Sequence, residues 1–353
     1  MTDDPSSDSL PSTLLEDIVG RTRLSLSQLA IVVGFVPILL LFPIAYITGE
    51  LPGRYNPPFW IPGLLPPAII VFVLLRQSRS RRLRDEAIKA IRPLVKLEDE
   101  HFQLAVSNAS MFNRRREWMA LGLGVVAGWL FLVAWGFTTL WLGIYSILFG
   151  GLMYGLIAWF LYSALSGTQL FNELNLHTQD LNIFDLEPLE PIARWSLGIA
   201  LTLIGGITLS LLINLPYFLF TRLMDLQSII IYSSLITATI MVFFLNMYST
   251  HRAMARAKAQ ELKRVRLNLA RISRAFKEQP DQSRPVNLEE FSNAITSWVA
   301  YEKRVKEVPE WPYTSQIRRN LLLSILLSIG AFMLPWILRG IFFQFLLEFF
   351  PFR

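Results

Sequence analysis

The chain has 353 residues and contains no cysteine. This absence excludes disulfide bonds, thiolate nucleophiles and cysteine-ligated zinc or iron–sulfur sites. Motifs of common enzyme classes are missing too, because the sequence has neither a G-x-x-x-x-G-K-S/T phosphate loop nor a G-x-S-x-G nucleophile elbow. The three histidines, His101, His177 and His251, are scattered and form no H-E-x-x-H zinc motif. We therefore expect no catalytic activity, no metal ion and no other cofactor.

Charged residues are also scarce. They make up 17% of the chain, whereas soluble domains contain about a quarter. By contrast, 53% of the residues are hydrophobic and the mean hydropathy is +0.42. These residues are concentrated in runs of about twenty, the length that a helix needs to cross about 30 Å of hydrocarbon. The pattern predicts an all-α, polytopic membrane protein with seven transmembrane helices, at about 29–47, 60–75, 119–140, 142–165, 195–220, 229–247 and from 321 to at least 338.

The second predicted span is the weakest of the seven. Pro62, Pro66 and Pro67 interrupt it, and each proline removes a backbone donor that a helix in hydrocarbon needs. Whether this span crosses the membrane fully stays open at this stage.

The basic residues indicate the orientation of the chain. The segment 76–116 carries eleven Lys and Arg residues and the segment 250–319 carries fifteen, together 26 of the 33 in the chain. Four predicted spans separate these segments, so both lie on one side, which is the cytoplasmic side by the positive-inside rule. The N-terminus is then cytoplasmic and the C-terminus outside. The first twenty residues carry five acids and no base, unlike a signal peptide, so we expect the first span to remain as an uncleaved anchor.

These predictions divide the chain into eight regions, with a helical layer on the cytoplasmic side. The regions are a cytoplasmic N-terminal segment (1–26), transmembrane helices 1 and 2 (27–75), cytoplasmic helices (76–117), a transmembrane hairpin (118–165), a cytoplasmic acidic elbow (166–193), transmembrane helices 5 and 6 (194–248), a cytoplasmic helical hairpin (249–318), and transmembrane helix 7 with an outer aromatic tail (319–353).

The region 249–318 has the pattern of two paired helices. Apolar residues in its first half are spaced as in a coiled-coil seam. They are Leu262, Val265, Leu269, Ile272 and Phe276. Beyond a turn, Asn287 and Glu290 form a start similar to a capping box, and apolar residues continue at helical spacing until Pro309. We predict an antiparallel helical hairpin. The alternative is that both arms pack back against 76–116.

The basic residues of this hairpin suggest which partners the chain has. They are Arg252, Arg256, Lys258, Lys263, Arg264, Arg266, Arg271 and Arg274. A solvated face is one interpretation, and contact with anionic lipid headgroups is another, because the first turns lie close to the bilayer. No aromatic stacking platform accompanies the charge, so we expect no nucleic acid. The expected partners are the lipid bilayer and either a second copy of the chain or a cytoplasmic protein.

The acidic cluster Glu98-Asp99-Glu100-His101 resembles a metal site only superficially. Four consecutive residues are spread around a helix and do not share one face. We interpret the cluster as a solvated turn that pairs with nearby arginines.

Small and weakly polar residues lie inside the predicted spans. Gly124 and Gly128 form one G-x-x-x-G pair, and Gly151 and Gly155 form a second. This spacing lets helix backbones approach closely, either within one chain or between copies. A further set could bond between helices or line a polar path. Its members are Asn214, Thr237, Thr239 and Asn246.

Arg339 is the one charge that could lie inside the membrane. It follows a long apolar run and precedes another that contains Gln344. One interpretation is an arginine at the interface that extends its charge toward water. The other is a helix that continues to Glu348, with Arg339 and Gln344 facing a pore as an anion-favouring ring in an oligomer.

A proline-interrupted acidic strip precedes the fifth span. Its acids are Asp180, Asp185, Glu187 and Glu190. Pro191 suits the first turn of a helix, and acids at that position are favoured by the helix dipole. We therefore interpret the strip as a helix start and as a cytoplasmic latch, whose carboxylates pair with the basic segments 76–116 and 252–274.

Two short motifs resemble those of a family of bacterial multi-pass membrane proteins to which no activity is attached. They are the elbow F-D-x-x-P-x-x-P-x-A-R from Phe184 to Arg194 and the stretch E-V-P-E-W-P-Y from Glu307 to Tyr313. The resemblance covers roughly 116–353 and implies a multi-pass topology in a bacterial plasma membrane. Two functions stay open. One is a non-catalytic scaffold or sensor that couples the helical bundle to the cytoplasmic layer. The other is an oligomeric ion channel or passive transporter with the last helix and Arg339 near the permeation path.

Overall fold

The computed structural model describes residues 13–22, 25–47, 63–95, 97–107, 113–135, 140–176, 183–185, 187–220, 226–277, 288–311 and 314–349. This part of the chain contains eleven α-helices and no strand, which confirms the predicted all-α class. The α-helices are α1 (Leu14–Thr22), α2 (Leu26–Ile47), α4 (Leu65–Ile91), α5 (Asp99–Ser107), α6 (Arg114–Trp135), α7 (Leu140–Tyr145), α8 (Gly151–Leu176), α9 (Glu190–Phe220), α10 (Leu226–Lys277), α11 (Leu288–Glu307) and α12 (Ser315–Phe349).

Six of the described helical segments are long and apolar enough to cross a membrane. They are Ser27–Ile47, Arg114–Val133, Gly143–Phe171, Glu187–Pro216, Ser228–Tyr248 and Ser315–Ile341. These six candidate spans mark the chain as a multi-pass membrane protein, and each overlaps a predicted span. The second predicted span corresponds to the start of α4, which is not among the six. Its apolar part ends at Leu75, and Arg76 follows.

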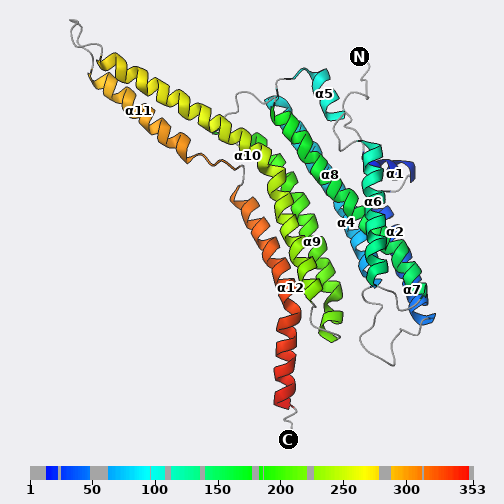
Figure 1. The fold of residues 1–353 in the computed structure, drawn as a ribbon. Coiled ribbons are helices and arrows are strands. Elements are labelled where there is room, and N and C mark those ends of the chain that lie inside the picture. Colours follow the sequence, from blue (N-terminus) through cyan, green and yellow to red (C-terminus); the bar gives the residue numbers. More distant parts are fainter. Residues whose placement is uncertain are drawn as a thin grey trace.

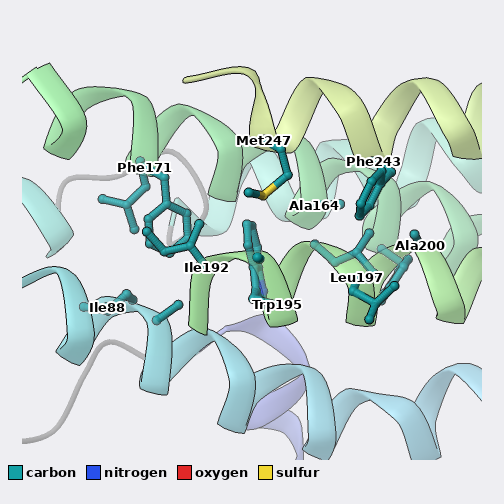
Figure 2. Close-up of a cluster of buried hydrophobic side chains, with 14 of the residues drawn as sticks. Ile88, Ala164, Phe171, Ile192, Trp195, Leu197, Ala200, Phe243 and Met247 are labelled. Atoms are coloured by element: carbon teal, nitrogen blue, oxygen red, sulfur yellow. The ribbon is translucent and has the colours of Figure 1, made fainter. Parts of the chain in front are cut away.

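The helices form a bundle in which α4, α8 and α9 occupy the centre (Figure 1). Helix α9 packs against α4, α10 and α12, while α8 packs against α6, α10 and α4. The core lies where α4, α8, α9 and α10 meet, and Figure 2 shows its side chains. Trp195 from α9 lies against Phe171 from α8, with ring centroids 5.0 Å apart, and Met247 from α10 is buried there as well. This shared core fixes the position of α10 relative to the bundle.

Helix α10 is a single helix of 52 residues that leaves the bundle (Figure 1). Its first part is the candidate span Ser228–Tyr248, and its second part carries the basic residues. Helix α11 runs back along this second part. The contacting pairs Lys258–Lys306 and Arg266–Glu302 run in opposite chain directions on the two helices. We call residues 251–277 of α10 together with α11 the arm.

Helix ends differ from the predicted boundaries where tertiary packing extends a helix. Helix α4 ends at Ile91, two residues before Pro93, because a proline disfavours the helical conformation of the residue before it. By contrast, α8 continues to Leu176, whereas the predicted span ended near 165. Ser166, Thr168 and Leu174 are buried against the bundle in this extension, so packing outweighs the weaker hydropathy. The predicted elbow 166–193 therefore begins as a helix.

Candidate functional site

The connection between α11 and α12 is fastened to α10. We call its described residues 308–311 the strap. The His251 ring of α10 stacks on the Trp311 ring, with centroids 4.2 Å apart and planes inclined by 8°. The Nδ1 atom of His251 lies 2.9 Å from the carbonyl oxygen of Glu310. The strap thus lies on α10 where that helix leaves the candidate span.

Lys258 holds the end of α11 beside the strap. Its Nζ donates hydrogen bonds of 2.9 Å to the carbonyl oxygens of Lys306 and Val308, and it lies 3.4 Å from a carboxylate oxygen of Glu310. The last carbonyls of a helix have no partner within that helix, so a cation there satisfies them and also suits the helix dipole. The Lys258 side chain is only 14% exposed, which places these contacts partly out of water.

Further contacts join the two helices of the arm. Val265 and Val305 are both fully buried between them. The Tyr301 hydroxyl donates a 3.1 Å hydrogen bond to Glu261. Burial is the larger cause that raises the pKa of Tyr301, and this hydrogen bond is the second. Glu302 accepts from Lys306 at 2.8 Å and lies 3.6 Å from Arg266. The hydrogen bond from Lys306 is the main reason why the pKa of Glu302 lies below its ordinary value.

A second polar cluster lies beneath the short N-terminal helix α1. The carboxylate of Glu16 accepts from the Thr13 backbone N–H at 2.9 Å and lies 3.5 Å from the Arg84 guanidinium of α4. Both side chains are almost fully buried, at 3% and 4% exposure. The Leu14 N–H donates a 2.7 Å hydrogen bond to Glu117, which is fully buried at the start of α6. The cluster attaches α1 to α4 and α6.

Most of the polar side chains predicted in the fifth and sixth spans form hydrogen bonds with backbone carbonyls of their own helix. The Asn246 and Thr168 side chains form a buried hydrogen bond between α10 and α8. Thr239 is buried and donates to the Leu235 carbonyl of its own helix, and Asn214 donates to Ser210 in the same way. Thr237 is exposed and donates to Ser233. Ser210 in turn bonds to Tyr232 at 2.9 Å, which joins α9 to α10.

The predicted glycine pairs lie where α6 and α8 touch. A Cβ added to Gly124 would lie 2.6 Å from the Tyr154 carbonyl oxygen and 2.9 Å from the Cα of Gly155. Gly128 faces the Tyr154 side chain, and Gly151 faces Trp129. The two helix backbones therefore approach each other at these glycines within one chain.

The acids of the predicted latch make local contacts. Glu190 pairs with Arg194 one turn later on α9, at 2.9 Å, and Asp185 accepts from the Glu187 N–H at 3.2 Å. In the part of the chain that the structure describes, no ion pair joins Asp185, Glu187 or Glu190 to either basic segment, and Asp180 lies outside that part. The elbow contacts the arm through aromatic rings instead, because the ring centroids of Phe184 and Tyr301 lie 5.7 Å apart.

The remaining predicted site residues are on α12 and near α5. Arg339 is exposed, and the part of α12 that follows the contact with α9 extends beyond the end of that helix (Figure 1). The position of the Gln344 side chain lies outside the description. Asp99 pairs with Arg92, as expected for a solvated acidic turn. Within the described residues no group of three or more His, Asp or Glu side chains could hold a metal ion.

The buried pair of Glu16 and Arg84 was not predicted, and Lys258 was expected on a basic face that is either solvated or in contact with anionic lipid headgroups. A signal for the first existed, because Thr13-Leu14-Leu15-Glu16 has the S/T-x-x-E form of a capping box. Lys258 carried no such signal, since its partners are backbone carbonyls about fifty positions away. Comparisons with protein-family profiles, curated proteins and solved structures find no match for this chain.

Proposed function

We propose that the chain is a non-catalytic membrane scaffold or sensor, in which the bundle and the arm move as coupled parts. The observation that carries this proposal is the continuity of α10, which passes from the candidate span into the arm without a break. A continuous helix transmits tilt or rotation from one end to the other, whereas a flexible linker does not. The strap extends the coupling, since His251 and Lys258 connect the arm to the chain that leads into α12.

The proposed setting is a bacterial plasma membrane, with the arm on the cytoplasmic side. Placement of the basic arm in the cytoplasm follows from the positive-inside rule. In this topology the predicted antiparallel hairpin is the cytoplasmic output. Its exposed apolar side chains, such as Leu267 and Val299, give a protein partner or a second copy something to bind. Basic residues near the bilayer would contact anionic headgroups.

The coupling can be measured between two labels, because the chain has no native cysteine. Gly20→Cys on α1 and Val299→Cys on α11 are at open positions: a Cβ at Gly20 meets nothing within 4 Å, and Val299 is 51% exposed. Spin labels at both sites should give one narrow distance distribution in liposomes, and the distance should shift between bilayers of short and long lipids. The same distance in both bilayers would contradict the proposal.

A matched pair of lysine variants tests the role of the strap in the same experiment. Lys258→Met removes the cation that bonds to the end of α11, and it should broaden the distance distribution. Lys263→Met removes a lysine that is exposed on the same helix, and it should leave the distribution unchanged. Equal behaviour of the two variants would show that the strap does not hold the arm.

One observation favours the alternative, an oligomeric channel or passive transporter. Arg339 lies exposed among exposed apolar residues of α12, which include Trp336 and Ile337. A charge on such a helix in a bilayer needs a partner or water, and a ring of Arg339 side chains in an oligomer would supply a wet, anion-favouring path. Anion flux into liposomes that falls in Arg339→Ala, but not in Arg319→Ala, is the expected result. Absence of flux in the unaltered protein would rule the channel out.

A further inference from the structure

A groove of about 380 Å³ lies between α4, α9 and α12. This volume falls within the roughly 300–1,000 Å³ range of small-molecule sites. Its lining residues are Phe72, Arg76, Leu201, Ile204, Gly205, Thr208, Leu209, Leu212, Ser324 and Leu327. The α9 and α12 walls belong to the candidate spans Glu187–Pro216 and Ser315–Ile341. The groove is therefore at a depth where the surrounding solvent is lipid.

The polar groups of the groove are satisfied, except for one charge. Thr208 donates to the Ile204 carbonyl and shares a 2.7 Å hydrogen bond with Ser328 of α12. Ser324 donates to Asn320 of its own helix. Arg76 is the only charged residue in the lining, and within the described residues no acidic side chain forms an ion pair with it. The like charge of Arg79 on the same helix acts on Arg76, so an anion beside Arg76 would offset this repulsion.

Arg76 lies at one end of the groove. Helices α4 and α9 are antiparallel, because the Leu83 side chain lies beside Gly198 and the Phe72 side chain lies beside Gly205. Arg76 lies between these contacts, near Leu201, and the groove continues from there to Leu212. Eleven residues of helix cover about 16 Å, close to half of the roughly 30 Å hydrocarbon core. The groove thus has a charged end and an apolar length of about one leaflet.

The dimensions of the groove favour an alkyl chain over a helix as the occupant. A volume of about 380 Å³ over about 16 Å gives a mean cross-section of about 24 Å². An α-helix with side chains is about 10 Å across, which corresponds to roughly 80 Å². The space inside the groove is thus narrower than a helix from a second copy, and its width suits a single alkyl chain. A cation at one end of an apolar slot complements an anionic headgroup.

We propose that this groove binds one anionic phospholipid of the bilayer, with its phosphate on the Arg76 guanidinium and one acyl chain along α9 from Leu201 toward Leu212. The bound lipid would occupy the space between α4, α9 and α12 and so help to hold α12 on the bundle. This inference rests on the groove alone and does not depend on the role of the arm.

Native mass spectrometry of the full chain in detergent tests the proposal. The probes are phosphatidylglycerol and phosphatidylcholine with identical acyl chains. The unaltered protein should bind one phosphatidylglycerol with about tenfold higher affinity than phosphatidylcholine. Arg76→Gln should remove this preference. Arg82→Gln, which removes an arginine from the exposed surface of the same helix, should retain it. Equal affinities in the unaltered protein, or a preference that survives in Arg76→Gln, would overturn the proposal.

Two further variants keep the test decisive if Arg76→Gln does not fold. Arg76→Lys retains the positive charge and should keep a preference for phosphatidylglycerol. Leu209→Trp fills the apolar part of the groove and should weaken binding of both lipids at least tenfold. Unchanged lipid binding in folded Leu209→Trp would place the lipid elsewhere. A dimer that replaces the lipid-bound monomer, and that Leu209→Trp abolishes, would identify a second copy as the occupant and would also overturn the proposal.

Discussion

Arg84 and Glu16 form a charge pair that is almost completely removed from solvent. Removal of Arg84 leaves the buried Glu16 carboxylate with a longer contact of 3.7 Å to the half-exposed Arg81, and breaking a buried pair costs roughly 3–5 kcal/mol. We predict that Arg84→Met destabilises the protein by about 3 kcal/mol. Its matched control is Arg82→Met, because Arg82 is 81% exposed and pairs with Glu86 at the surface, where such pairs contribute about 0–1 kcal/mol. Thermal unfolding in detergent compares the two variants, and equal melting temperatures would contradict the prediction.

Gly124 allows α6 and α8 to lie close together, because it has only a hydrogen atom where other residues have a side chain. An alanine there would bring its Cβ to 2.6 Å from the Tyr154 carbonyl oxygen, and backbone atoms cannot move aside as a flexible side chain can. We predict that Gly124→Ala costs about 1–3 kcal/mol through overpacking between α6 and α8.

Gly122 provides the control on the same helix, because a Cβ at that position meets nothing within 4 Å. Gly122→Ala should be neutral or slightly stabilising. Both variants can be compared by the temperature at which the protein aggregates in detergent. Should Gly124→Ala behave like Gly122→Ala, α6 and α8 do not pack as closely as described.

At the level of elements, we expect the contact between α10 and α11 in the arm to depend on pH. The folded pKa of Glu302 lies below its ordinary value of 4.5, chiefly because Lys306 donates a hydrogen bond to it and Arg266 is nearby. A carboxyl with a lowered folded pKa binds protons more weakly in the folded state than in the unfolded state. Its contribution to stability is therefore present above the unfolded pKa and is lost as the pH falls through the folded pKa.

We predict that backbone amides of α11 exchange faster with solvent as the pH falls below about 4.5, after correction for the intrinsic effect of pH on exchange. In Glu302→Gln this additional acceleration should be reduced, because the glutamine does not titrate. Glu307→Gln replaces an exposed acid on the same helix and should behave like the unaltered chain. An identical pH dependence in Glu302→Gln would assign the effect to another group.

The sequence predicts the candidate spans well because a run of about twenty apolar residues has one stable arrangement in a bilayer. Helix ends such as that of α8 are less predictable, since burial of Leu174 and its neighbours depends on residues distant in sequence. The same limit applies to the candidate site. The stacking of His251 on Trp311 and the bonds from Lys258 to the strap join positions about fifty or sixty residues apart. No local pattern encodes such pairs.

At the scale of the whole molecule, the path of α4 decides on which side the C-terminus lies. One end of α4 is near α7, because the Tyr145 hydroxyl donates a 2.9 Å hydrogen bond to the Gly63 carbonyl. Its other end reaches the cluster of Arg84, Glu16 and Glu117 at the start of α6. Between Gly63 and Arg84, a helix covers about 32 Å, similar to the roughly 30 Å hydrocarbon core. Helix α4 is therefore about as long as the hydrocarbon core is thick, although only its first part is apolar.

We predict from this path that α4 crosses the membrane as a seventh span. Single cysteines at Gly20 and Val299 should then react with an impermeant maleimide from the cytoplasmic side, and a cysteine at Arg353 should react from the opposite side. Permeabilised cells provide the control that all three cysteines are reactive. Labelling of Gly20→Cys and Arg353→Cys from one side and of Val299→Cys from the other would mean six crossings, with α4 entering and leaving the bilayer on the same face. The basic residues of α4 beyond Leu75 would then have to lie within the membrane or at its surface, at a cost that the positive-inside arrangement avoids.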